Sequence, residues 1–259
     1  MPLQSPEAYI KQTILAVQEY SILCGTAIAD VFTRPHYWDD IYTQMDSIGV
    51  GSMPIILLTG FFTGCVLALQ SETALQGFGA VSMTPSLVAL SMVKELGPVL
   101  TGLMVSGRNA AGMASELGSM KVTEQLDAMR ALGTDPIRKL VTPRLIATIF
   151  MLFFLTVIAD AAGILGGALI SVTILGLNGN SYLHKSYSGL VHGDIVQGLT
   201  KPIFSGFIIA TVGCYCGMKT TGGTQGVGRA TTQAVVISSV FIIIVDLLVT
   251  RAMIGIFGS

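Results

Sequence analysis

The chain has 259 residues, of which 51% are apolar and only 11% are charged, and its formal net charge is -1. Average soluble domains carry about 25% charged residues, which keep their surfaces in solution. The composition, with a mean hydropathy of +0.71, therefore excludes an ordinary soluble domain and predicts a protein whose solvent is lipid. The slight negative charge argues against nucleic acid as a partner, because phosphate binding requires a clustered positive excess.

The first element is a helix over residues 5–33, which we expect to lie on the membrane surface rather than to cross it. Its apolar residues Ile10, Ile14, Val17 and Ile22 recur near helical spacing. Any spanning run is interrupted by Lys11, Gln12, Gln18 and Glu19. The dipeptide Arg34-Pro35 should end the helix. We assign residues 1–45 to this interfacial region; the alternative is a cytoplasmic helix packed on protein.

The remainder, residues 46–259, predicts five spanning helices, because each of five apolar stretches approaches or exceeds the roughly 20 residues that cross a bilayer. The third is broken only by Asp160 and contains Gly163-x-x-x-Gly167, a small-residue pattern suited to close helix packing. A polar connector over residues 178–194 follows it. The five stretches are residues 46–72, 83–106, 145–177, 195–218 and 230–257.

Basic residues predict the orientation, since they concentrate on the cytoplasmic side of membrane proteins. We therefore expect the N-terminus in the cytoplasm and the C-terminus outside it. In this orientation, few basic residues other than Lys185 lie on the extracytoplasmic side. The residues then placed in the cytoplasm are Lys11, Arg34, Arg108, Lys121, Arg130, Arg138, Lys139, Arg144, Lys219 and Arg229.

A charged segment, Glu116 to Lys139, separates the second and third spans. Apolar residues at helical spacing predict a short amphipathic helix over about residues 122–133, with Thr123 capping its start and Gly133 and Pro136 ending it. Such a helix is too short to be stable alone in water, so it needs a surface to dock on. That surface is either a partner or the rest of this chain.

Besides Asp160, charged residues within the apolar stretches include Lys94, Glu95, Lys201 and Asp246. Ionised groups inside a bilayer cost several kcal/mol unless they are paired or hydrated. Gly97-Pro98 weakens the helix beside the first two, which suits a polar cavity wall. Alternatively, the lysines extend to the interface and Asp246 makes a structural hydrogen bond.

No catalytic or metal-binding pattern is found in the sequence. The four cysteines form no Cys-x-x-Cys pair, and the three histidines lie in predicted connectors. The glycine-rich stretch at residues 220–229 imitates the start of a phosphate-binding loop, but Arg229-Ala230 replaces the required Lys-Ser/Thr and no strand precedes it. We expect a tight cytoplasmic turn there, and no enzymatic activity or metal in this chain.

Four motifs closely resemble the MlaE family, the permease subunits of ABC systems that move lipids with MCE-domain partner proteins. They are Glu95-Leu-Gly-Pro-Val, Gly107-Arg-Asn-Ala-Ala, the segment from Glu116 to Met129, and Asp135-Pro-Ile-Arg. Thr231-Thr and Asp246 also look like the last helix of that family.

The resemblance implies an all-α integral membrane protein with an N-terminal interfacial elbow helix, five transmembrane helices, and a cytoplasmic coupling helix between the second and third. It implies a homodimer in the bacterial inner membrane, with a periplasmic MCE-domain protein on one side. On the other side, a separate cytoplasmic ABC ATPase would hold ATP and magnesium.

The resemblance also implies roles for individual residues. ATPase coupling would fall to Thr123, Glu124, Gln125, Asp127, Ala128, Met129, Arg130 and Leu132. Contact with a phospholipid or related lipid would fall to Glu95, Pro98, Lys201 and Asp246.

Two other functions are compatible with the residues. A secondary transporter could use protons through Glu95 and Asp246, although that class usually shows inverted repeats and more spans. A membrane scaffold that transports nothing would need neither acid.

Overall fold

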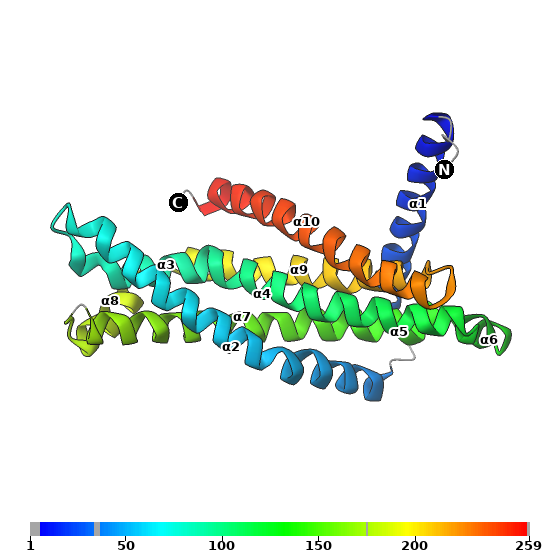
Figure 1. The fold of residues 1–259 in the computed structure, drawn as a ribbon, viewed down its shortest axis with the longest axis horizontal. Coiled ribbons are helices and arrows are strands. Elements are labelled where there is room, and N and C mark those ends of the chain that lie inside the picture. The colour runs from blue at the N-terminus through cyan, green and yellow to red at the C-terminus, as the bar shows by residue number, and fades with distance from the viewer. Residues whose placement is uncertain (1–5, 34–36, 175, 258–259) are drawn as a thin grey trace.

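The computed structural model describes residues 6–33, 37–174 and 176–257, and this part of the chain contains helices but no strand. Most of the helices run side by side in one elongated bundle, with α6 (Gln125–Ala131) at one end and α8 (Gly179–Ser188) at the other (Figure 1). The prediction of an all-α protein is therefore confirmed.

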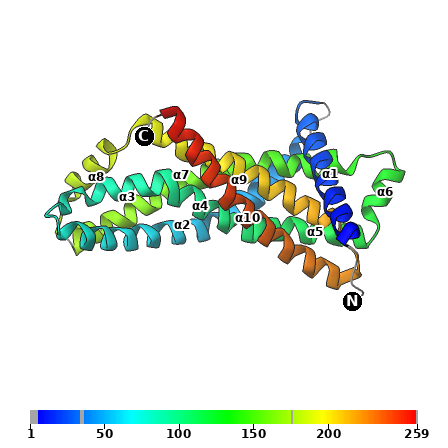
Figure 2. The ribbon, with the colours of Figure 1, turned by 90° about the horizontal axis from the view of Figure 1, so that it is seen from above.

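Helix α1 (Pro6–Val31) crosses the long axis of the bundle near the α6 end, as Figures 1 and 2 both show. Leu23 and Ala27 are buried against the bundle, whereas Ile14 and Val17 are exposed. The predicted helix is thus present with an apolar outer side. Its place on the membrane surface stays a prediction, and the break predicted at Arg34-Pro35 lies outside the described residues.

Helices α2 (Trp38–Gln76) and α7 (Thr142–Thr173) pack closely along much of their lengths. Small residues permit this approach, because a Cβ atom added to Gly64 would overlap the carbonyl oxygen of Gly163. A Cβ added to Gly60 would lie 2.7 Å from the carbonyl oxygen of Ala159. The close packing predicted around Gly163 is confirmed.

The second predicted span was too short, because one continuous helical segment runs from Val81 to Val122. The helix continues through Arg108 and Asn109 because α2 supplies hydrogen-bond acceptors for both side chains. Arg108 Nη1 donates to the Ser47 carbonyl and the Ser52 hydroxyl, both at 3.0 Å, and Asn109 donates to the Ser52 hydroxyl at 3.4 Å. The segment comprises η1 (Val81–Met83), α3 (Thr84–Ser91), the π turn η2 (Met92–Leu96), α4 (Gly97–Val105), the π turn η3 (Ser106–Ala110) and α5 (Ala111–Val122).

Other boundaries also differ from the prediction. A further π turn, η4 (Ile137–Val141), precedes α7, and α8 folds within the predicted connector. Helix α9 (His192–Met218) starts three residues earlier than expected because Asp194 accepts a hydrogen bond from the Val191 amide at 3.0 Å.

The glycine-rich stretch forms a turn only over its first residues, after which α10 (Gly223–Phe257) begins seven residues earlier than expected. Gly222 and Gly223 have φ angles of 86° and 67°, which glycine adopts without steric cost. The remaining glycines up to residue 228 belong to the first turns of the helix.

Within the described residues, six helical segments are long and apolar enough to cross a membrane: the five predicted spans and Ile14–Val31. The bundle also exposes large apolar side chains along its length, including Phe62, Leu165 and Leu247. Helices satisfy their own backbone groups, so an apolar exterior of this kind suits lipid.

Candidate functional site

Three of the four residues predicted to bind substrate meet in the middle of the bundle. Glu95 lies in η2, Lys201 in α9 and Asp246 in α10. The Lys201 ammonium forms ion pairs with Glu95 Oε2 and with Asp246 Oδ1, the latter at 3.0 Å. The Lys201 side chain is only 2% exposed, so it is a buried cation shared by two carboxylates.

The π turn η2 presents Glu95 to this cluster. Pro98 has no amide hydrogen and cannot donate to the preceding turn, and the Gly97 amide donates to the Met92 carbonyl five residues back. The predicted weakness at Gly97-Pro98 therefore takes the form of a π turn. Pro98 itself is buried at the start of α4, where it shapes the backbone.

One face of α9 receives this turn. Lys94 pairs with Asp194 at 3.0 Å, and Gln197 donates to Glu95 Oε1 at 3.3 Å. A Cβ atom added to Gly198 would overlap the Val93 carbonyl oxygen, so glycine allows the two backbones to meet. Both lysines are drawn into ion pairs within the bundle, Lys94 with Asp194 and Lys201 with Glu95 and Asp246, while their depth in the membrane stays a prediction.

Exposure within the cluster is graded. The Asp246 side chain is 20% exposed and Glu95 is 41% exposed, while Lys201 is sealed beneath them. Thr250 donates to Glu95 Oε1 at 3.4 Å. The site thus offers a partly exposed carboxylate beside α10, a helix that elsewhere exposes large apolar side chains, including Val240, Phe241, Ile244, Leu247 and Leu248.

Sequence reasoning missed two acids beside this site. Asp194 was placed in a connector but belongs to α9 and holds Lys94. Asp160, noted only as a break in an apolar stretch, is 8% exposed in α7, and its Oδ1 occupies the space where a Cβ of Gly97 would lie. That oxygen has no hydrogen-bond partner among the described residues. A lone acid in a long apolar helix was the available signal.

The charged end of the bundle differs from its prediction in detail. The amphipathic helix is α6, which spans seven residues rather than residues 122–133. Thr123 does not cap its start: the Thr123 hydroxyl donates back to the Ser119 carbonyl at 2.9 Å and closes α5. Glu124 joins the two helices in a left-handed conformation with φ of 59°, and Gly133 ends the element as predicted.

Most residues predicted to contact an ATPase face outward. Leu126 is buried and Met129 is half-buried, which anchors α6 to the bundle. Asp127 accepts from Lys121 at 2.8 Å and pairs with Arg130 at 3.3 Å. The hydrogen bond from Lys121 holds the pKa of Asp127 below its usual range. The exposed residues are Thr123, Glu124, Gln125, Asp127, Ala128, Arg130 and Leu132.

The described part of the chain contains no group of three or more His, Cys, Asp or Glu side chains that could hold a metal ion. The four cysteines are free thiols, of which three are buried. Two polar features of the described residues bear on function, namely the ion-paired cluster in the middle of the bundle and the charged end at α6.

Long apolar helices around a buried polar cluster define a multi-pass α-helical membrane protein. The family described as Permease MlaE matches residues 41–252, and the chain belongs to this family. The resemblance seen in the motifs is thereby confirmed.

Several relatives align with most of this chain. The chain is 44% identical to a probable ABC transporter permease protein of Rickettsia bellii, covering 93% of this chain and 94% of the relative. It is 34% identical to the intermembrane phospholipid transport system permease protein MlaE of Haemophilus influenzae, covering 90% of each. It is 35% identical to the chloroplastic protein TRIGALACTOSYLDIACYLGLYCEROL 1 of Arabidopsis thaliana, covering 93% of this chain and 68% of the relative. The chain is thus an ABC-type permease.

Proposed function

We propose that this permease moves phospholipids, or related lipids, between the inner membrane and a periplasmic MCE-domain partner, driven by ATP hydrolysis on a separate ATPase subunit. The observation that carries the proposal is the ion-paired cluster of Glu95, Lys201 and Asp246, in which a buried cation holds a partly exposed carboxylate among long apolar helices. The name of the Haemophilus influenzae relative, a phospholipid transport permease, supports the choice of cargo.

The cluster would serve the lipid in two ways. Exposed apolar side chains of α10 would contact the acyl chains, because removing apolar surface from water is favourable. Glu95 and Asp246 would face the head group, while Lys201 holds both carboxylates in place. Pro98 would contribute by fixing the π turn that aims Glu95.

Two copies of the chain would enclose this site. Helix α10 exposes many large apolar side chains in a single protomer, and a homodimer would cover part of them and form a lipid cavity between the two copies. In the inner membrane, the α6 end and the N-terminus would lie in the cytoplasm and the C-terminus in the periplasm, with α1 as the elbow helix on the membrane surface.

Helix α6 would be the coupling helix. Its exposed side chains would enter a groove of the ATPase, which holds ATP and magnesium, while Leu126 transmits the movement because it is packed into the bundle. Glu124, Asp127 and Arg130 would supply polar contacts, and Met129 and Leu132 apolar ones.

Charge reversal tests the coupling role. The double variant Glu124→Lys and Asp127→Lys should release the ATPase during purification while the permease elutes as a folded species. Asp39→Lys with Asp46→Lys, two exposed acids on α2, makes the same change of charge as a control and should retain the ATPase. Copurification at the wild-type level by the α6 variant would refute the role.

A second experiment tests the lipid site. Mass spectrometry of the purified complex should find retained phospholipid, and Glu95→Ala with Asp246→Ala should reduce both this lipid and ATP-dependent transfer. Unchanged transfer by the variant would favour a scaffold. Transfer that needs a proton gradient but no ATP would favour a secondary transporter.

A further inference from the structure

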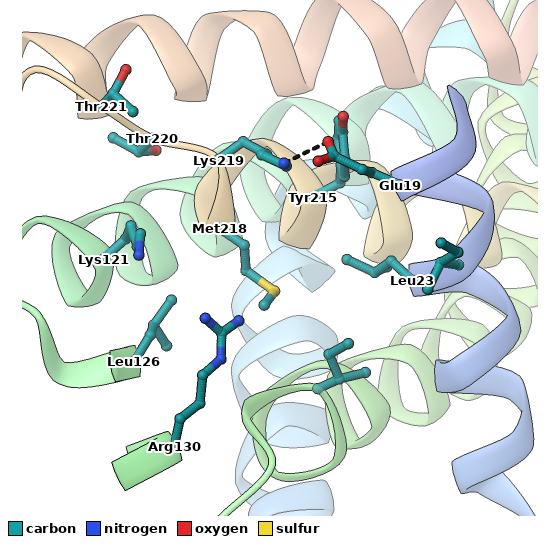
Figure 3. Close-up of a pocket in the computed structure, with 12 residues that line it drawn as sticks. Glu19, Leu23, Lys121, Leu126, Arg130, Tyr215, Met218, Lys219, Thr220 and Thr221 are labelled. Carbon is teal, nitrogen blue, oxygen red and sulfur yellow. Dashed lines mark ion pairs between the residues drawn. The ribbon is translucent and has the colours of Figure 1, made fainter. Parts of the chain in front are cut away.

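A cavity of about 380 Å³ lies at the α6 end of the bundle, enclosed by α1, α5, α6, α9 and the turn after α9 (Figure 3). Its lining is mostly apolar, with Leu23 from α1, Leu126 from α6 and Met218 from α9. The cavity is therefore built from elements far apart in the sequence.

Three cations line the same cavity. Arg130 of α6 extends toward Met218, Lys121 comes from α5, and Lys219 follows α9 with its ammonium directed toward Glu19 (Figure 3). Two carboxylates hold these bases, since Asp127 pairs with Lys121 and Arg130 while Glu19 pairs with Lys219 at 2.5 Å. Three cations against two carboxylates leave a positive surplus, which attracts an anion.

The apolar wall indicates what kind of anion fits. Ile22 of α1 lines the cavity and is 55% exposed, and Leu15, two turns earlier on the same side of that helix, is 46% exposed. A soluble anion would gain nothing from this wall. An anionic amphiphile can use both the basic side chains and the apolar wall, because its charged group pairs with the bases while its acyl chains pack along α1.

The cavity is also distinct from the polar cluster in the middle of the bundle. Lys201 and Lys219 are 18 residues apart on α9 and the residue that follows it, which corresponds to about 27 Å along a helix. One molecule's head group cannot occupy both places.

We propose that this cavity binds the phosphate group of an anionic phospholipid from the leaflet around the α6 end, as a resident lipid and not as cargo. The lipid contacts α1 through its chains and the bases beside α6 through its phosphate. It thereby ties the N-terminal helix to the charged end of the bundle.

The test uses the full chain purified in detergent and titrated with fluorescent phosphatidylglycerol against a phosphatidylcholine background. Lys121→Gln with Lys219→Gln should weaken binding at least about tenfold, since each basic group near a lipid phosphate contributes several-fold. Lys11→Gln with Arg229→Gln removes two exposed cations outside the cavity lining and should change binding less than about twofold. Glu19→Gln should strengthen binding, because it frees Lys219.

Several outcomes would overturn the proposal. They are an equal loss in the control variant, equal binding of phosphatidylcholine, and displacement of the lipid by millimolar inorganic phosphate, which would indicate a site for soluble phosphate. If the glutamine variant elutes as an aggregate, Lys121→Arg with Lys219→Arg keeps the charge and should bind as the wild type does. Loss of binding in that folded variant would also contradict the proposal.

Discussion

The middle and the α6 end of this molecule use the same ionic chemistry in different surroundings. In the middle, one base serves two acids, because Lys201 pairs with Glu95 and Asp246. At the end, one acid serves two bases, because Asp127 pairs with Lys121 and Arg130. Lys201 is 2% exposed, whereas Arg130 is 56% exposed.

Burial decides what each group of charges can do. A buried charge that loses its partner stays in a medium of low dielectric constant, so the middle cluster is hard to change. Exposed pairs are hydrated and screened, so those at the α6 end contribute little to folding and can exchange partners. The first arrangement suits a fixed binding site and the second suits a contact surface.

The largest expected effect is that of Lys201→Met, which leaves two carboxylates without their shared cation. We expect the free energy of unfolding, measured by denaturant titration in detergent, to fall by about 3 kcal/mol, because Glu95 can recruit some water. The triple variant Glu95→Gln, Lys201→Met and Asp246→Asn removes all three charges and should recover most of the loss. If Lys201→Met alone is as stable as the wild type, the middle cluster contributes as little to folding as the exposed ion pairs at the α6 end.

Gly97→Ala should destabilise the protein by about 2 kcal/mol, since the added Cβ overlaps Asp160 Oδ1 and crowds the Met92 carbonyl. Gly112→Ala in α5 is the matched control, because its Cβ would meet no atom within 4 Å. The control should be neutral or stabilising by up to about 1 kcal/mol. In a double-mutant cycle, Asp160→Ala should offset part of the Gly97→Ala cost. If the stability losses of Gly97→Ala and Asp160→Ala simply add, the overlap with Asp160 Oδ1 is not the cause of the Gly97→Ala destabilisation.

Glu124→Gly should stabilise the corner between α5 and α6 by about 1 kcal/mol, because glycine adopts the positive φ without strain. The same substitution should weaken ATPase copurification, since it removes a proposed contact. Gln125→Gly, one residue into α6, should instead destabilise by a similar amount. Thermal unfolding measures the change in stability, and copurification measures ATPase binding. A lower stability of Glu124→Gly would contradict the proposal that the positive φ of Glu124 strains the backbone.

The smallest expected effect is at the exposed pair itself. Lys121→Gln should leave unfolding nearly unchanged but raise the pKa of Asp127 toward its usual value. The sign follows from the lowered pKa of Asp127 in the folded protein: its interaction with Lys121 favours folding above the unfolded-state pKa and is lost as pH falls through the folded-state value. Carbon-13 NMR of the Asp127 carboxyl measures this, and identical titrations in the two proteins would exclude the contact.

Two parts of the structure could be predicted because their physical causes are visible in sequence. Membrane length fixes the number of long apolar helices, and the cost of isolated charge in lipid singled out Glu95, Lys201 and Asp246. The missing amide of Pro98 predicted a weak point in the helix, although not that it would become a π turn.

The rest depends on neighbours that a sequence does not reveal. The second span continues past Ser106 because Ser47 and Ser52 satisfy Arg108. Thr123 closes one helix instead of opening the next, since its hydroxyl found an acceptor behind it rather than ahead. Likewise, the sequence marks Asp160 only as a charged residue within an apolar stretch. Its contact with Gly97 arises only when α7 packs against α4.

The π turns carry a consequence for how this permease tolerates insertions and deletions. Each π turn holds about one more residue than an α turn, which rotates the side chains beyond it by about 100° around the helix axis. Removing one residue from Met92–Leu96 would let regular hydrogen bonding resume and give a smoother helix. Yet every side chain on one side of the cut would then point at the wrong neighbour, so the local repair would misalign the whole bundle.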